Sequence, residues 1–316
     1  MTAVAGAVVL VAGVVALASL RGSAASPPGA VQPTAATPLP ATPPPTSVRV
    51  TSIAGLLSVL ADDSVANIVV ADGTYRVSRA SSQASDSLWI GARYASRTRP
   101  VTVWAETRGG VTLDGGGTIA YGCISFEAGA HDQTWDGFQC ADGSPTQTGV
   151  IVFGGYAGQA APHHITLRNW SLLASLTTPS TGATDHGVYF SEAVGGPHDI
   201  TLENLSVDGS GGLDSAIHAF HSDATNQNAW NVTIAGLSVS GTAQALILWD
   251  STLHDWTIRD STIANATDTA VRFESPGATG ISFTNVTSTG SGSGRGFYSS
   301  LGSNPPGVTF TNTSWH

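Results

Sequence analysis

The chain has 316 residues, enough for one large domain or two ordinary ones, and only 11% of them are charged. It contains 37 glycines, no lysine, and 12 arginines against 22 acidic residues, which gives a formal net charge of −10. A chain this acidic argues against nucleic acid as a partner. The charge is uneven, because residues 76–108 hold six arginines and two acids, whereas the chain from Gly109 onward holds four arginines and 17 acids. An anionic ligand is therefore attracted to the first segment and repelled by much of the second.

The first 25 residues have the character of a secretory signal. Residues 3–20 are an unbroken run of small and aliphatic side chains, and Ser23 and Ala25 provide the small residues of a cleavage site. The run has no basic N-terminal region and is long enough to span a bilayer, so a retained membrane anchor is the alternative. We expect a secreted or cell-surface protein that meets a membrane only through an uncleaved N-terminal segment.

Residues 26–46 read SPPGAVQPTAATPLPATPPPT and are rich in proline, alanine and threonine. Such a segment cannot form a core and is typical of a stiff, extended linker. The sequence therefore predicts a tether followed by one folded domain over residues 47–316.

The predicted domain opens with TSIAGLLSVLADDSVANIVVADGTYRVS, in which residues 52–61 have an amphipathic helical pattern before a strand and a tight glycine turn. RPVTVWAETRGGVTLDGGG then supplies a further coil. Over residues 53–117 these motifs resemble the N-terminal cap and first coils of right-handed parallel β-helix proteins, especially the chondroitinase B and alginate lyase group. The resemblance implies an all-β fold, a right-handed parallel β-helix with a short N-terminal capping helix. One fold hosts many reactions, so the resemblance indicates the reaction only weakly.

Two cysteines, Cys123 and Cys140, lie in apolar stretches. Export favours a disulfide between them, whereas their surroundings equally suit stacked core residues. The sequence leaves both interpretations open.

From about residue 100 the chain repeats a strand that begins with a small residue, followed by a strand reading apolar-Thr-apolar-x-Asn. The last position of this phrase recurs at intervals of 35, 32, 24, 25 and 27 residues, at Asn169, Asn204, Gly236, Asp260, Asn285 and Asn312. A period of roughly 20–50 residues without a helical pattern predicts stacked β-coils that share one apolar core. The recurring asparagines predict a ladder at a turn, which by itself generates Asn-x-Ser/Thr sequons, so we give glycosylation little weight.

The first strand of each coil aligns on its small residue, as in GVYFSE, AIHAFH, ALILWD and AVRFES. The second position is apolar and is predicted to point inward: Val188, Ile217, Leu246, Val271 and Phe297. By alternation the third and fifth positions point outward: Tyr189, His218, Ile247, Arg272 and Tyr298, then Ser191, Phe220, Trp249 and Glu274. The sixth position is too polar for a core, so the strand is expected to turn there: Glu192, His221, Asp250 and Ser275. His218 and His221 are therefore both expected to face solvent on one wall.

This wall carries the groups that β-elimination of a uronic-acid polymer needs, namely a cation for the carboxylate, a base for the C5 proton and an acid for the leaving oxygen. We assign Arg272 as the cation, His218 as the base, and Tyr189 or His221 as the acid. Further substrate contacts are expected from Trp249, Asp250, Glu192, Glu274 and Phe220. Trp249 and Phe220 could equally serve to cover the barrel. The expected partner is an acidic polysaccharide. The resembled lyases use a Lys/Arg pair and usually calcium, and a chain without lysine cannot carry that site.

Other functions remain open at this point. C5 epimerisation needs the same groups without elimination, and a glycoside hydrolase would need two carboxylates, which Asp250 and Glu274 could supply. A non-catalytic glycan-binding module would explain the tether equally well. Whether the protein is an enzyme is thus undecided, with a polysaccharide lyase favoured over a glycoside hydrolase. Asp185, His186 and Asp214 precede their strands and could join the site or shape turns, and we favour the turn role.

No cofactor is expected. A zinc site is disfavoured because His218 and His221 lie on different sides of a bend, whereas zinc ligands must converge at about 2 Å from the metal. A calcium site from Glu192, Asp250 and Asp223 is an alternative that no motif supports. We expect a monomer.

Overall fold

A computed structural model describes residues 42–77, 88–115, 123–141, 149–154, 159–173, 186–191, 193–209, 212–220, 227–292 and 295–316. The chain divides into two units, Met1–Pro40 and Ala41–His316, and every described residue belongs to the second. The predicted leader and most of the predicted linker lie outside the described residues. Within these residues no helix is both long and apolar enough to cross a membrane.

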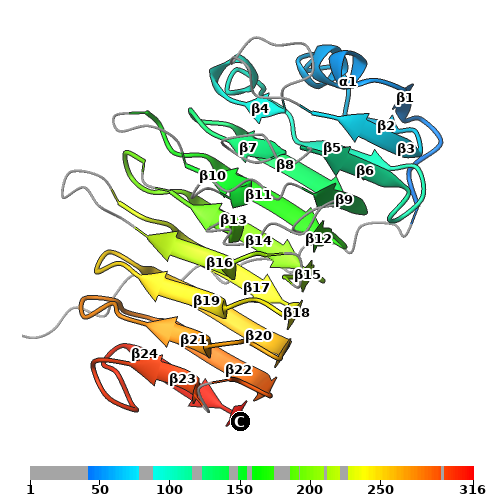
Figure 1. The fold of residues 1–316 in the computed structure, drawn as a ribbon. Helices are drawn as coiled ribbons and strands as arrows, with labels where there is room; N and C mark the ends of the chain where they lie inside the picture. Colours follow the sequence, from blue (N-terminus) through cyan, green and yellow to red (C-terminus); the bar gives the residue numbers. More distant parts are fainter. Residues whose placement is uncertain are drawn as a thin grey trace, which may run out of the picture. The chain divides into compact units, whose positions relative to one another are not determined.

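The second unit is a parallel β-helix, as predicted, in which successive coils stack strands into three faces (Figure 1). The first face consists of β4 (Trp89–Ile90), β7 (Ile124–Phe126), β10 (Gly149–Phe153), β13 (His186–Phe190), β16 (Ser215–Phe220), β19 (Gln244–Trp249), β21 (Thr269–Phe273) and β23 (Arg295–Ser299). The second consists of β1 (Val48–Val50), β2 (Asn67–Val70), β5 (Val101–Ala105), β8 (His131–Asp136), β11 (His163–Arg168), β14 (His198–Glu203), β17 (Trp230–Ala235) and β24 (Val308–Thr311). The third consists of β3 (Gly73–Arg76), β6 (Val111–Asp114), β9 (Phe138–Ala141), β12 (Ser171–Leu173), β15 (Ser206–Asp208), β18 (Ser238–Ser240) and β25 (Ser314–Trp315). Two long strands, β20 (His254–Ala264) and β22 (Ile281–Thr289), run across both the second and the third face.

The N-terminal end is covered by the predicted helix, α1 (Ile53–Leu60), followed later by a short 3-10 helix, η1 (Ala92–Tyr94). The Ser52 side chain caps α1 by accepting a hydrogen bond from the Gly55 amide at 3.1 Å. Arg97 closes the other end of α1, because its guanidinium donates to the carbonyls of Leu60 and Val65 at 2.8 Å. Arg97 is only 3% exposed, so this arginine of the basic segment is structural and does not attract a ligand.

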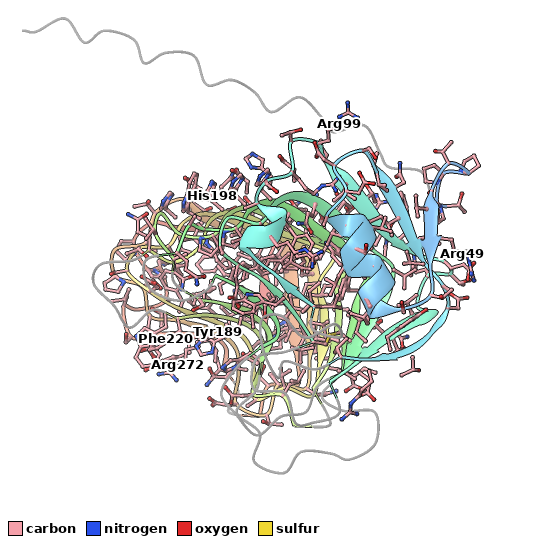
Figure 2. All side chains as sticks on the ribbon, turned by 90° about the horizontal axis from the view of Figure 1, so that it is seen from above. Arg49, Arg99, Tyr189, His198, Phe220 and Arg272 are labelled. Atoms are coloured by element: carbon pink, nitrogen blue, oxygen red, sulfur yellow. A yellow bond between two sulfur atoms is a disulfide. The ribbon has the colours of Figure 1, made fainter. Side chains whose placement is uncertain are left out.

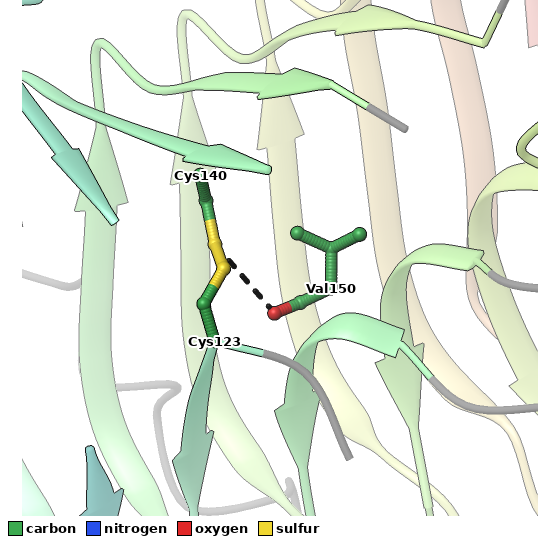
Figure 3. Close-up of a disulfide and its surroundings, with 3 residues drawn as sticks. All are labelled: Cys123, Cys140 and Val150. Atoms are coloured by element: carbon green, nitrogen blue, oxygen red, sulfur yellow. Dashed lines mark hydrogen bonds between the residues drawn. A yellow bond between two sulfur atoms is a disulfide. The ribbon is translucent and has the colours of Figure 1, made fainter. Parts of the chain in front are cut away.

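The interior is a continuous apolar core built from the inward residues of all three faces. Phe126, Phe153 and Phe190 stack along the axis with ring centroids 5.2 Å apart. Within this core a disulfide joins Cys123 to Cys140, and Cys140 Sγ lies 3.7 Å from the Val150 carbonyl oxygen (Figure 3). Both interpretations of the cysteines therefore hold: they are core residues, and they are bonded.

The predicted asparagine ladder is present at the corner between the second and third faces. Asn204 Nδ2 donates to Asn169 Oδ1 at 3.2 Å, and Asn312 Nδ2 donates to Asn285 Oδ1 at 3.2 Å. These residues have positive φ, between 50° and 57°, a conformation that asparagine tolerates better than most residues. Gly236 occupies one rung with φ 69°, which explains why the repeat has glycine there.

Candidate active site

The outward columns of the first face follow the predicted register. Tyr189, His218, Ile247, Arg272 and Tyr298 are paired in sequence along β13, β16, β19, β21 and β23. The inward partners Val188, Ile217, Leu246 and Val271 are fully buried. Figure 2 shows Tyr189, Phe220 and Arg272 together at one corner of the coils. The sequence therefore placed these side chains on one wall correctly.

This wall encloses a cavity of about 470 Å³. Its lining comes from four successive coils: His186, Tyr189, Asp214, His218, Phe220, Gln244, Ile247, Trp249 and Arg272. We refer to it as the pocket. A cavity of this size with a mixture of aromatic and charged walls is typical of a small-ligand or glycan subsite.

Two histidines from adjacent coils are hydrogen-bonded in the wall of the pocket. His218 Nδ1 lies 2.7 Å from His186 Nε2, and His186 Nδ1 lies 2.8 Å from Ser215 Oγ. His186 also lies near a carboxylate, since its Nδ1 is 3.9 Å from Asp214 Oδ2. His218 Nε2 has no hydrogen-bond partner among the described residues and is shielded from solvent.

Both rings are neutral at ordinary pH. Burial is the main cause that lowers the pKa of His186 to about 2, and the neighbouring His218 contributes a smaller part. Burial is also the main cause that lowers the pKa of His218 to about 4, and the positive charge of Arg272 contributes a smaller part. Burial also raises the pKa of Asp214 above the usual value for a carboxyl, against the opposing charge of Arg272.

The expectation that His218 faces solvent holds only in part, because its side chain lines the pocket but is half-buried in the wall. Its ring is covered by the T-shaped contact with Tyr189 at 5.5 Å and by a tilted contact with Phe220 at 5.9 Å. Ile247, the next outward residue of the column, is only 5% exposed. Large neighbours on adjacent coils therefore bury outward positions that alternation alone assigns to solvent.

Arg272 is the positive charge of the pocket and is held from two sides. Its Nε donates to Glu274 Oε1 at 2.8 Å, and its guanidinium lies 5.0 Å from the centre of the Trp249 ring. No described residue accepts a hydrogen bond from its two Nη groups. Glu274 thus acts on the pocket by orienting Arg272. A carboxylate could take both Nη groups in the bidentate geometry that arginine favours.

Two aromatic residues form the outer rim of the pocket. Trp249 is 43% exposed and makes a T-shaped contact with Phe220 at 5.6 Å. An exposed indole beside a cavity can stack on the apolar face of a sugar ring. Both residues therefore lie within reach of a ligand bound in the pocket.

Asp250, which the sequence assigned to substrate binding, does not line the pocket. It is 4% exposed, and its Oδ1 accepts hydrogen bonds from the Thr252 amide at 2.7 Å and hydroxyl at 2.8 Å. Ser275, at the same position of the next coil, is fully buried and accepts from the Asp250 amide. The side chains of these polar residues are buried because they accept hydrogen bonds from backbone amides at the turn. Their polarity therefore did not indicate exposure to solvent. The carboxylate pair of Asp250 and Glu274 proposed for a hydrolase is not assembled in the pocket.

Several predicted residues cannot be placed. Glu192, His221, Asp185 and Asp223 lie outside the described residues. In the part of the chain that the structure covers, no three or more His, Cys, Asp or Glu side chains are grouped to hold a metal ion. The calcium alternative, which depends on Glu192 and Asp223, remains an expectation.

Sequence reasoning missed Ser215 and favoured a turn role for His186 and Asp214, which both line the pocket. The reason is local, because the first three residues of β13 and of β16 are all buried, so alternation does not hold where these strands begin. One signal in the sequence could have indicated them: His186 and Asp214 lie within four residues of Tyr189 and His218, which were already assigned to the wall.

A second group of histidines lies elsewhere. On the second face the rings of His163 and His198 stack at 5.0 Å, and Trp230 continues the row at 4.5 Å from His198. Figure 2 shows His198 on a different side of the coils from Tyr189 and Arg272. This row does not contribute to the pocket.

No known protein-family model matches the chain, and no characterised protein matches it in sequence. Among solved structures, it is similar to an alginate lyase from Paenibacillus sp. str. FPU-7, with 12% identity and a TM-score of 0.55 over 85% of this chain and 98% of that one. A PL6 family polysaccharide lyase from Pseudopedobacter saltans has 12% identity and a TM-score of 0.45 over 77% of this chain and 53% of that one. The catalytic domain of a GH87 α-1,3-glucanase in complex with tetrasaccharides has 14% identity and a TM-score of 0.34 over 88% and 71%. At these identities the first likeness establishes a shared fold.

Proposed function

We propose that this protein is a secreted or cell-surface carbohydrate-active enzyme that cleaves an acidic polysaccharide by β-elimination in the pocket. The observation that carries the proposal is the position of Arg272 relative to His218. The Nη groups of Arg272 have no hydrogen-bond partner among the described residues. Arg272 lies two coils after His218 in the same outward column, with Ile247 between them. Neighbouring strands of a sheet lie about 4.8 Å apart, so cation and imidazole are roughly 10 Å apart at the backbone, the span of one sugar ring with its substituents.

Each group has a role that its geometry supports. Arg272 pairs with the uronate carboxylate and stabilises the negative charge that develops when the C5 proton leaves. His218 Nε2 accepts that proton, and the Tyr189 hydroxyl donates a proton to the departing oxygen. Trp249 and Phe220 hold the neighbouring sugars by stacking.

An anionic substrate also improves the base. The positive charge of Arg272 is one of the two causes that lower the pKa of His218. A carboxylate bound to Arg272 offsets that charge and raises the pKa of His218, which makes the imidazole a stronger base only when substrate is present. A neutral glycan would not have this effect, which favours an acidic polymer.

The disulfide supports the extracytoplasmic location, because such bonds persist in oxidising compartments. The same fold carries an alginate lyase in Paenibacillus, so it accommodates chemistry of this class.

A glycan-binding module without catalysis is the second candidate. The observation that favours it is the shielding of His218 Nε2, which must become accessible before it can reach a C5 proton. A panel of anionic and neutral polysaccharides, incubated with the protein and followed by unsaturated-uronate absorbance and by pull-down, tests both. Absorbance that grows with one polyuronate supports the lyase; retention of polymer with no absorbance change supports the module.

A further inference from the structure

The two pocket histidines pose a problem for any base mechanism. A proton that stayed on His218 would place a second positive charge beside Arg272 in a largely buried site. Charge repulsion and desolvation both oppose that state. The proton therefore needs a destination beyond His218.

The hydrogen-bonded chain behind His218 offers one. His218 Nδ1 contacts His186 Nε2 at 2.7 Å, and each such contact between two nitrogens holds a single hydrogen. His186 Nδ1 points to Ser215 Oγ at 2.8 Å and to Asp214 Oδ2 at 3.9 Å. Asp214 has a side chain that is 38% exposed, whereas the His186 side chain is 6% exposed. The chain thus runs from a shielded nitrogen in the pocket to a carboxylate in contact with solvent.

We propose that His218, His186 and Asp214 form a proton relay that carries the substrate proton from the pocket to solvent, with Ser215 positioning the middle ring. The inference rests on the proposed lyase function and deepens it. His186 and Ser215 act through His218 and are positioning residues.

The transfer balances without another reactant. The C5–H bond breaks, its electron pair enters the sugar carboxylate system, and the proton joins His218 Nε2. The Nδ1 proton of His218 passes to His186 Nε2, and the Nδ1 proton of His186 passes to Asp214 Oδ2. Expulsion of the C4 oxygen, protonated by Tyr189, forms the C4–C5 double bond. Both rings end neutral, Asp214 as a neutral acid releases its proton to water, and the phenolate left at Tyr189 takes up a proton from water.

The charged and titratable groups around the relay agree with this direction. His218 is faced by Tyr189 and His186 from β13 and by the charge of Arg272 from β21. Asp214 is faced by Arg272 and by Asp268. The last transfer requires Asp214 Oδ2 to move about 1 Å closer to His186 Nδ1, within the range of an exposed side chain.

Three variants test the relay in the full chain: Asp214→Asn, Ser215→Ala and His186→Gln. Asp255→Asn and His254→Gln are matched controls, because His254 Nδ1 and Asp255 Oδ2 form an exposed pair at 2.9 Å on β20. We expect Asp214→Asn to lower kcat by at least about tenfold with KM nearly unchanged, and His186→Gln by about a hundredfold. Added formate should restore part of the kcat of Asp214→Asn, since a small carboxylate replaces the lost acceptor. Unchanged kcat and pH profile in Asp214→Asn would overturn the relay.

A measurement without substrate separates failure of the relay from failure of the proposed function. Imidazole ¹⁵N spectra of the free protein should show His186 and His218 neutral at pH 6, with ring signals of both residues shifting together in Ser215→Ala and unchanged in Asp255→Asn. Two rings that titrate independently near their ordinary pKa would refute the relay even if the protein cleaves polymer. Coupled rings in a protein that cleaves no polyuronate would refute the lyase function. The relay would then be overturned as well, because the hydrogen-bonded pair would have no substrate proton to carry.

Discussion

The Nδ1 atom of His218 lies 2.7 Å from the Nε2 atom of His186 on the preceding coil, so a half-buried and a buried imidazole share one hydrogen in the pocket wall. The two side chains are therefore one unit in both stability and chemistry. Loss of the His218 ring leaves the buried Nε2 of His186 without a partner, which costs about 1–3 kcal/mol.

Replacement of His218 with alanine should affect both properties. We expect activity to fall by at least about a hundredfold because the base is lost, and the free energy of unfolding to fall by about 1–3 kcal/mol because His186 Nε2 loses its partner. Urea denaturation and initial rates measure the two effects. His254→Ala, at an exposed position, is the control and should change stability by less than about 0.5 kcal/mol. Unchanged stability in His218→Ala would mean that the ring is exposed after all.

The neutral histidine pair should make the protein sensitive to acid. The folded pKa values of His218 and His186, about 4 and about 2, lie below the unfolded value of 6.5, so the unfolded chain binds more protons as pH falls. The stability that the neutral rings provide is therefore complete above pH 6.5 and is lost progressively below it. Between about pH 6 and pH 4 the free energy of unfolding should fall by up to roughly 1.4 kcal/mol per pH unit for each ring, and by less for His218 near pH 4, where the folded protein also binds the proton.

Thermal denaturation in that pH range measures this loss. A double variant, His186→Asn with His218→Asn, should have a shallower dependence on pH than the natural protein, even though it is less stable. An identical slope in the two proteins would assign the acid sensitivity to other groups.

Replacement of Arg272 with alanine should weaken binding and turnover together, because the carboxylate is held in both the ground state and the transition state. We expect Kd for the polymer to rise by at least about tenfold and kcat to fall by about a hundredfold. Arg259→Ala is a matched control, since Arg259 pairs with Asp260 at 2.7 Å on a different face. Equal effects of both replacements would show that net charge matters and the pocket does not.

The asparagine ladder should contribute to stability through its conformation as well as its hydrogen bonds. Asn204 has φ 53° and donates to Asn169 Oδ1 at 3.2 Å. Asn204→Ala loses the hydrogen bond and places alanine in a left-handed conformation, so we expect a loss of about 1–3 kcal/mol. Asn204→Gly keeps the conformation and should lose clearly less. If both variants were equally stable by urea denaturation, the positive φ would carry no energetic consequence.

Much of the fold followed from the sequence. The repeat predicted stacked coils, the small residue at each strand start predicted the pairing of Val188 with Ile217 and Leu246, and the amphipathic segment predicted α1. These features are local or periodic, and the same pattern recurs on every coil. The register therefore had several independent determinants.

The candidate site followed less well because it depends on contacts between coils. His218 is partly covered by Tyr189 and Phe220, and the Asp250 side chain accepts a hydrogen bond from the backbone at a turn. The alternation of inward and outward residues along a strand predicts neither contact. His186 entered the site from the irregular start of β13. A single sequence predicts which face a residue occupies but not which neighbours cover it.

The mass of the products is the most direct test of the central claim. Polyuronate incubated with the protein and analysed by mass spectrometry should yield oligosaccharides whose non-reducing ends are unsaturated and lighter by one water than hydrolysis products. The natural protein should form them and His218→Ala should not. Saturated fragments would identify a hydrolase, and polymer of unchanged length would identify an epimerase or a binding module; either result would contradict the lyase assignment.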